Sequence, residues 1–356
     1  MNRVRRIHPG FYIKESLDAM EMTSKEFSIR TGISERTLSA IINGNGNITF
    51  DVAYKLSQYF DSSITFWTNL QTEFELYLRE NEAYSIEKED YKLIKPIKKY
   101  LIDFNYISKE DNEETVVKKC RYLAGVNSLS LLNKEDPFAC FKEQHYAKKS
   151  DPFLQNFWIA LALNEARRKR NKSFDKQKLF NFIPELRCLT KEKISIFYPR
   201  LKEIFEQSGV CFVLLPYLPN SNIYGVTKWL SFDNVMLAVS NRGGNANLFW
   251  FTLFHEISHV LMGHKRETLL NLDGSLDAEA DKMALDMLIP EEEWLRFSKL
   301  EFYSVKSINE FALKTGIHPC IVLGRLHKER PDKVPYGTFD KQINVAYDTS
   351  EMITCN

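Results

Sequence analysis

Short amphipathic stretches separated by turn residues fill the N-terminal part of the chain, which is the pattern of a small helical domain. Apolar residues at helical spacing predict a first helix over residues 8–22. A capping box, in which Glu26 follows Thr23 by three residues, predicts the start of a second short helix. We expect Phe27 and Ile29 on this second helix to face the core of the domain.

A glycine turn and a further capped stretch come after the second helix. The turn falls at Gly32, and a third helix is predicted from Ser34 to Asn43. Two short helices joined by a glycine-containing turn form the helix-turn-helix pattern. A fourth helix is predicted over residues 49–60 and a fifth from Ile64 onward. The N-terminal domain is therefore expected to have five helices.

The exposed side of the predicted third helix is polar, as expected of a helix that enters the major groove of DNA. The side chains expected to reach base edges or phosphates from this helix are Glu35, Arg36, Thr37, Ser39, Ala40 and Asn43. The expected phosphate-facing cations are Arg3, Arg5, Arg6, Lys25 and Arg30. The same pattern would also suit a small helical protein–protein module, so the residues alone leave both kinds of partner open.

The middle of the chain differs in character from the region after residue 208. Residues 79–205 have helical apolar spacing and carry no catalytic motif, whereas β composition begins at residue 209. A buried strand is predicted over 210–215, and the stretches 229–232 and 235–239 are predicted to pair as a hairpin. Such a small sheet could form one wall of a substrate cleft, and a peptide could add to its edge as a strand.

Residues 248–262 predict a helix that is apolar on every side, which is typical of a helix in a protein core. His255 and His259 are four residues apart and therefore lie one turn above each other on one face. Two imidazoles so placed can share one Zn²⁺, with Glu256 beside the water bound to the metal. The alternative interpretation is a pair of core histidines bonded to backbone carbonyls.

A second predicted helical stretch, residues 277–290, offers carboxylates that could complete a metal site. Asp277 and Asp281 share one face of this stretch at i and i+4. Asp277 is the expected third ligand, with Glu279 as an alternative, and Asp281 is expected to hold a ligand histidine from the outer shell. These acidic residues would also suit the exposed N-terminus of a helix, where the dipole favours negative charge.

Composition and charge narrow the class of protein. The length of 356 residues indicates two or three domains. A net charge of +1 excludes global attraction to nucleic acid, so any DNA binding must come from a local patch. Six cysteines without a Cys-x-x-Cys pair indicate reduced thiols, not a disulfide framework. The chain lacks a signal-peptide core and a membrane-length apolar run, so we expect a cytoplasmic protein without membrane contact.

The region from about residue 209 to 326 resembles the ImmA/IrrE family of metallo-endopeptidases. The stretches that carry the resemblance include FTLFHEISH at 251–259, EADKMALDMLIP at 279–290 and GIHPCIVLGRL at 316–326, with further matches at 209–216, 224–230 and 235–240. The resemblance implies a zincin-like domain that binds Zn²⁺ and hydrolyses peptide bonds. The family usually carries Glu where this chain has Asp277, and the shorter side chain implies weaker metal binding or the use of Glu279.

Residues 8–78 resemble the lambda-repressor-type (XRE) domain of HigA-type antitoxins. The stretches that carry this second resemblance include HPG at 8–10, TGISERTLS at 31–39 and FWTNLQ at 66–71, with further matches at 42–44, 48–49 and 53. Ser28 departs mildly from the family, which usually has a small Ala there. The resemblance implies binding to operator DNA and a toxin as protein partner. A helix-turn-helix that reads palindromic half-sites about 34 Å apart favours a homodimer.

Together these patterns predict an α+β protein that is mostly α. The expected domains are a five-helix lambda-repressor-like domain at 1–78, a helical spacer at 79–205, a zincin-like domain with a small β-sheet and the HExxH helix at 206–330, and a tail at 331–356.

This organisation supports two classes of function. The first is a DNA-binding regulator or antitoxin fused to a zinc endopeptidase that cuts a repressor, a partner protein or itself. In this class Glu256 takes a proton from water as general base and returns it to the leaving amine. The second is a non-catalytic antitoxin or autorepressor that binds operator DNA and a toxin, with a degenerate metallopeptidase domain. The Asp at position 277 favours the second class.

Overall fold

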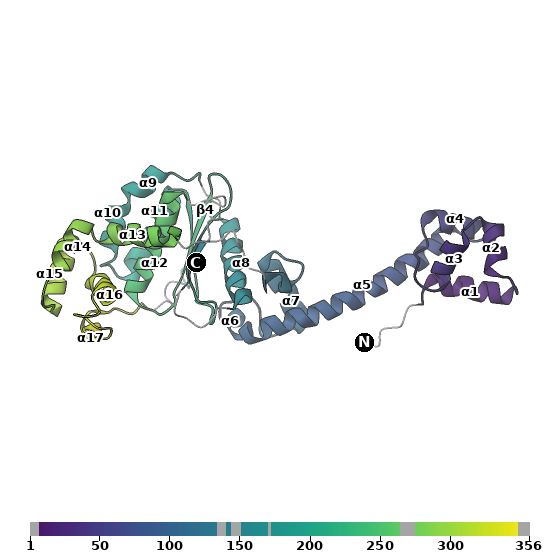
Figure 1. The fold of residues 1–356 in the computed structure, drawn as a ribbon, viewed down its shortest axis with the longest axis horizontal. Helices are drawn as coiled ribbons and strands as arrows, with labels where there is room; N and C mark the ends of the chain where they lie inside the picture. Colours follow the sequence, from purple (N-terminus) through teal and green to yellow (C-terminus); the bar gives the residue numbers. More distant parts are fainter. Residues whose placement is uncertain (1–6, 134–139, 144–150, 170–171, 264–274, 348–356) are drawn as a thin grey trace. The chain divides into compact units, whose positions relative to one another are not determined.

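The computed structural model describes residues 7–133, 140–143, 151–169, 172–263 and 275–347, and Figure 1 shows the fold. The chain divides into two compact units, Met1–Asp90 and Tyr91–Asn356. The sequence places the first boundary after residue 78, whereas the structure divides the chain inside a long helix.

The described residues of the first unit form the expected series of helices. They are α1 (Pro9–Ala19), α2 (Ser24–Thr31), α3 (Glu35–Ile42), α4 (Phe50–Tyr59) and α5 (Ile64–Ile94). Side-chain caps start the helices where the sequence predicts them: Thr23 accepts a hydrogen bond from the backbone N–H of Glu26, and Ser34 accepts one from Thr37. Each cap satisfies a backbone donor that the first turn of a helix leaves without a partner.

One compact core joins the helices of the first unit. Its fully buried residues include Ile13, Phe27, Leu38 and Leu56. The prediction that Ile29 faces this core is wrong, because its side chain is 76% exposed. Two residues along a helix turn by about 200°, so a side chain two positions after Phe27 points to the opposite face. Helical geometry thus separates two apolar residues that lie close in sequence.

A four-stranded sheet with the order β1-β3-β4-β2 lies at the centre of the second unit. Its strands are β1 (Cys140–Glu143), β2 (Val210–Leu215), β3 (Ile223–Trp229) and β4 (Val235–Ser240). The predicted strand at 210–215 is confirmed. A hairpin with Trp229 opposite Val235 at its turn is present, but its first strand is β3 and not the predicted stretch 229–232. Only Trp229 of that stretch lies in a strand, and Phe232 in the turn is 86% exposed. The sequence did not predict β1.

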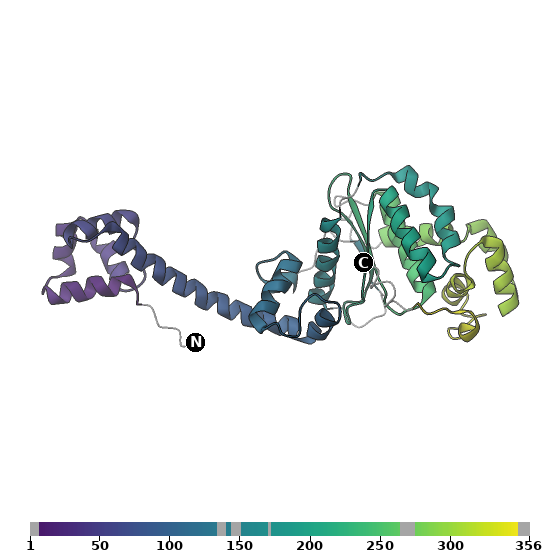
Figure 2. The same cartoon turned by 180° about the vertical axis from the view of Figure 1, so that it is seen from behind.

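Helices cover both faces of this sheet. On β2, Val210, Phe212 and Leu214 enter one hydrophobic core, and the residues between them enter a second core on the other face. One face carries α6 (Lys98–Asp103), α7 (Glu113–Ala124) and α8 (Pro152–Arg168) with two 3₁₀ turns, Lys95–Ile97 and Leu129–Asn133. Figure 2 shows α8 and α11 on opposite sides of the sheet. Because both faces are covered, β2 and β4 are buried along their whole length.

The remaining helices build the second face and the end of the unit. They are α9 (Lys176–Asn181), α10 (Ile183–Leu189), α11 (Ile194–Gln207), α12 (Ala246–Met262), α13 (Ser275–Leu288), α14 (Glu291–Phe297), α15 (Val305–Thr315), α16 (Pro319–Glu329) and α17 (Asp340–Ile343). Residues 91–205, which the sequence assigns to a spacer, contribute to both cores. Among the described residues, none of the helices combines the length and the apolar character that crossing a membrane requires.

Candidate functional site

The helix-turn-helix unit presents a polar surface along α3. Leu38 and Ile41 are buried, and the side chains that the sequence predicts to contact DNA point outward. Those that are exposed are Lys25, Glu35, Arg36, Thr37, Ser39 and Asn43, whereas Ala40 is half-buried. The amide of Asn43 donates to the hydroxyl of Ser39 over 3.3 Å.

The structure describes only some of the cations that the sequence predicts around α3. Arg30 pairs with Glu26 on its own helix at 2.7 Å, while Arg3, Arg5 and Arg6 lie outside the described residues.

A close approach between α1 and α3 fixes how this surface is held. A Cβ atom at Gly10 would lie 1.8 Å from the carbonyl oxygen of Ile41, so only glycine fits between the two helices. His8 caps α1 by accepting a hydrogen bond from the backbone N–H of Gly10 at 3.0 Å. The packing of α1 against α3 and the cap at the start of α1 therefore hold the polar surface of α3 in a fixed position.

The second candidate site lies on α12, the central helix of the other unit. Asn245 caps its start through a bond to the backbone N–H of Asn247, and Gly263 ends it in the left-handed conformation. His255, Glu256 and His259 are almost completely buried. Polar groups in such surroundings need partners within the protein or a bound ion.

The two imidazoles and one carboxylate converge at the surface of α12 that faces α13. His255 Nε2 lies 3.1 Å from His259 Nε2, and Asp277 Oδ1 lies 3.4 Å from His259 Nε2 and 4.0 Å from His255 Nε2. All three ligand atoms are within 4.8 Å of one another. Tetrahedral Zn²⁺ with bonds of about 2.0–2.1 Å places its ligand atoms about 3.3 Å apart. The donor set and its spacing therefore fit a zinc ion.

Asp281 holds one of these imidazoles in place. Its Oδ1 lies 2.7 Å from His255 Nδ1, and its Oδ2 accepts a hydrogen bond from the ammonium of Lys328 at 3.2 Å. A proton on Nδ1 leaves the lone pair of His255 Nε2 directed at the group formed with His259 and Asp277. Glu279, the alternative ligand, is exposed and lies outside this group.

The charge state of Asp277 suits a ligand. Burial opposes ionisation of this carboxyl and would raise its pKa, but the hydrogen bond with His259 and the nearby imidazole of His255 outweigh burial. The net result is a pKa below the usual value for aspartate. The carboxylate form, which is the form that binds a cation, is thus favoured by its neighbours.

Glu256 follows His255 on α12 and faces strand β3 of the sheet. The hydroxyl of Thr227 on β3 donates to Glu256 Oε2 at 2.7 Å. A Cβ atom at Gly225 would lie 2.8 Å from Glu256 Cγ and Oε1, so the glycine lets the strand approach this carboxylate. Sequence reasoning missed both residues. The signal that could have found Gly225 is a glycine inside an otherwise apolar and β-branched strand.

Comparison with known proteins bears on the first unit. A family model for the helix-turn-helix matches residues 13–67. The uncharacterized HTH-type transcriptional regulator YbaQ of Escherichia coli is 30% identical over 81 residues, which is 22% of this chain and 72% of that protein. Antitoxin HigA-1 of Vibrio cholerae is 34% identical over 94 residues, which is 26% of this chain and 85% of that protein.

A solved structure of an addiction module antidote protein of the HigA family from Coxiella burnetii is 32% identical, with a TM-score of 0.23. The match covers 24% of this chain and 96% of that one.

The residues that match the family model include all of α3 and its exposed polar surface. The fold and the comparisons therefore agree on a DNA-binding class of protein. Through this N-terminal unit, the chain belongs to the helix-turn-helix family of transcriptional regulators, and its relatives include an antitoxin. The predicted helix-turn-helix and its antitoxin-like character are confirmed at this level.

Proposed function

We propose that this chain is a DNA-binding regulator that also hydrolyses peptide bonds with a zinc ion held by His255, His259 and Asp277. The observation that carries the peptidase half is the convergence of these three ligand atoms within 4.8 Å of one another. Glu256 comes directly after the first histidine, which is the position of the general base in this motif, and is buried beside β3.

The DNA-binding half acts through α3. Its exposed polar side chains enter the major groove, and Lys25 contacts a phosphate beside it. A homodimer on palindromic operator half-sites is the assembly that suits such a domain. The toxin partner is proposed because Antitoxin HigA-1 carries that role in its name.

The chemistry of the second site depends on the positions of its side chains. A zinc ion held there would act as a Lewis acid that polarises the scissile carbonyl and lowers the pKa of water. Glu256 would take the proton of the attacking water and pass it to the leaving amine, while Thr227 holds one carboxylate oxygen at 2.7 Å. Asp281 keeps the imidazole of His255 in the orientation that ligation needs. The substrate is a repressor, a partner protein or the chain itself.

A second candidate is a non-catalytic antitoxin or autorepressor that binds operator DNA and a toxin. Asp277 favours it, because this acid is one methylene shorter than the Glu usual in the family that the region resembles. In this case, the His/His/Asp group would have a structural role only, and Glu256 would be a buried partner of Thr227.

One experiment separates the two candidates. The full chain is co-expressed with the products of its neighbouring genes in medium that contains zinc. Cleavage of these products is followed by mass spectrometry, and the zinc content of the purified chain is measured. We expect cleavage by the wild type and by Glu310→Gln, an exposed glutamate on α15, and none by Glu256→Gln, which keeps its zinc. Zinc-loaded wild type that cuts none of these proteins favours the antitoxin alone.

A further inference from the structure

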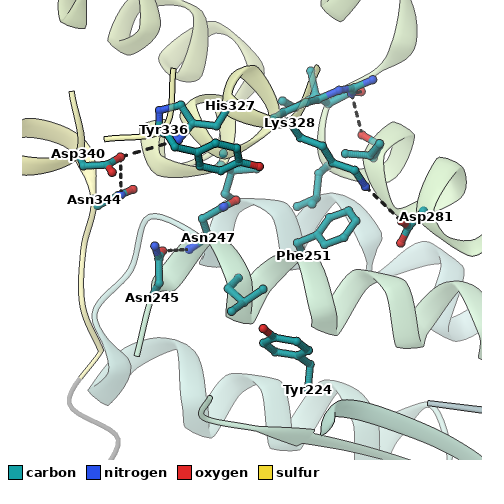
Figure 3. A pocket seen from close by; sticks show the side chains of 17 residues that line it. Tyr224, Asn245, Asn247, Phe251, Asp281, His327, Lys328, Tyr336, Asp340 and Asn344 are labelled. Atoms are coloured by element: carbon teal, nitrogen blue, oxygen red, sulfur yellow. Dashed lines mark hydrogen bonds and ion pairs between the residues drawn. The ribbon is translucent and has the colours of Figure 1, made fainter. Parts of the chain in front are cut away.

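Figure 3 shows a pocket beside the N-terminal half of α12. Its lining residues on α12 lie on the helix face that carries the two histidines. Leu248 and Phe251 line the pocket and precede His255 by about two turns and one turn of the helix. The ring centroid of Phe251 lies 6.5 Å from that of His255. Asp281, which bonds to His255 Nδ1, also lines the pocket. This cavity, which we name the α12–α16 pocket, therefore begins beside the proposed metal ligands.

The walls of the α12–α16 pocket are mainly apolar. The apolar surface comes from Leu248, Phe251, Leu285, Leu288, Ile289 and Ile321, and polar or charged side chains complete the lining. The cavity has a volume of about 520 Å³, within the range of cavities that bind small ligands. Removing a large apolar group from water into such a cavity is favourable in proportion to the area buried. The size and the lining both suit a bulky aliphatic or aromatic group.

The cations in the wall are already engaged within the protein. Lys328 pairs with Asp281 at 3.2 Å and lies over the ring of Phe251 at 5.3 Å. Arg325 pairs with Glu329 at 2.8 Å, and its second nitrogen bonds to backbone carbonyls of α13 and the residue after it. An acidic guest would have to compete with these bonds. The pocket therefore favours a neutral group over an anionic one.

Uncharged polar groups also line the pocket. Figure 3 shows Tyr224 on the sheet side, across from Asn247 and Tyr336. Tyr224 immediately precedes Gly225, where a side chain would collide with the carboxylate of Glu256. The backbone of a peptide substrate bound at these amide and hydroxyl groups would thus run between the pocket and Glu256, the proposed general base.

We propose that the α12–α16 pocket receives a large apolar side chain, of the Leu, Met or Phe class, from one of the two residues that flank the scissile bond. This assignment rests on the proposed peptide hydrolysis and names the class of peptide that the site selects. The guest side chain lies along α12 next to Phe251, and the peptide backbone continues past His255 towards Glu256.

The first arm of the test measures cleavage specificity. Full-length zinc-loaded protein is incubated with a peptide library that is randomised around a central bond, and the cuts are read by mass spectrometry. We expect an enrichment of about tenfold or more for Leu, Met or Phe over Ala or Asp at one flanking position. Leu285→Trp fills the pocket and removes this preference, Leu285→Ala shifts it to larger side chains, and Leu295→Trp, an exposed site on α14, leaves it unchanged.

The second arm measures binding and needs neither metal nor turnover. Methyl-labelled full chain is titrated with N-acetyl-leucine methylamide or its aspartate analogue and followed by NMR. We expect saturable shifts of the Leu285 and Ile321 methyl groups, at least about tenfold weaker for the aspartate analogue, and loss of binding in Leu285→Trp.

The two arms distinguish failure of the pocket from failure of the enzyme. Cleavage without an apolar preference, or with a preference that Leu285→Trp leaves intact, overturns the assignment of the pocket while peptide hydrolysis stands. Absence of leucine-amide binding also overturns it. Binding without any cleavage by zinc-loaded protein overturns the peptidase, and with it the pocket's role in substrate choice.

Discussion

The helices α3 and α12 both combine apolar and polar side chains, but they place the polar ones in opposite surroundings. On α3, Arg36 and Thr37 are exposed and the apolar residues face the core. On α12, His255 and Glu256 are buried. Exposed polar groups remain satisfied by water until DNA replaces it, whereas buried ones must be satisfied within the fold or by an ion. Function can therefore be removed from α3 without a change of stability, but at α12 the two are coupled.

The largest expected effect comes from removing a buried ligand. His259→Ala takes away one of three converging atoms, so we expect zinc binding to be lost and peptide cleavage to fall by at least about 10³-fold. Binding to the DNA upstream of the gene should change by less than about twofold, because α3 belongs to the other compact unit. Zinc analysis, peptide cleavage and fluorescence anisotropy measure the three quantities. Cleavage that persists in this variant would contradict the proposed ligand set.

A smaller loss of zinc affinity is expected from changing Asp281, which contacts a proposed ligand and not the ion itself. Asp281→Asn weakens the hold on His255 Nδ1, and such substitutions usually lower metal affinity by about 10–100-fold. Competition with a chelator of known affinity measures this change. Asp286→Asn on the same helix is the matched control, since Asp286 bonds to the backbone N–H of Glu291 and not to a histidine. Equal affinities in the two variants would remove the positioning role of Asp281.

On the exposed helix, the expected effect falls on DNA affinity alone. Arg36→Ala removes a cationic side chain from the surface of α3, and we expect a loss of about 1–3 kcal/mol in operator binding. The temperature of unfolding should stay the same because the side chain is exposed. Arg296→Ala, an exposed arginine on α14, is the control. If Arg36→Ala changed stability as much as DNA binding, the contrast between the two helices would fail.

The smallest expected effect is a pH dependence in the first unit. Burial lowers the pKa of His8 below 6.5, although a backbone hydrogen bond with Gly46 acts in the opposite direction. The unfolded chain then binds protons more readily, so the stability that neutral His8 contributes is present above pH 6.5 and is lost as pH falls below it. His8→Asn keeps a capping side chain and should flatten this dependence. Hydrogen exchange of the α1 amides, corrected for the intrinsic effect of pH, measures it.

Local features of the sequence predicted the parts of both sites that depend on neighbours in the chain. Thr23 and Ser34 start their helices because a cap involves residues three positions apart. The histidines of α12 share a face because they are four residues apart. The same reasoning applied with attention to helical rotation would have placed Ile29 on the exposed side of α2.

Contacts between distant parts of the chain could not be read in this way. Thr227 bonds to Glu256 across 29 positions, and only the packing of α12 on β3 brings the two together. The strand β1 has four residues, too few for a period of two to be distinguished. Asp277, and not Glu279, lies beside the two histidines because of how α13 is rotated against α12. Spacing within a single helix does not determine that rotation.

X-ray absorption at the zinc edge of the purified full chain tests the central claim most directly. We predict one zinc per chain, bound by two imidazole nitrogens and two oxygens at about 2.0–2.1 Å. In His259→Ala this signature should disappear. A chain without zinc, or a zinc spectrum that His259→Ala leaves unchanged, would contradict the assignment of His255, His259 and Asp277 as a metal site.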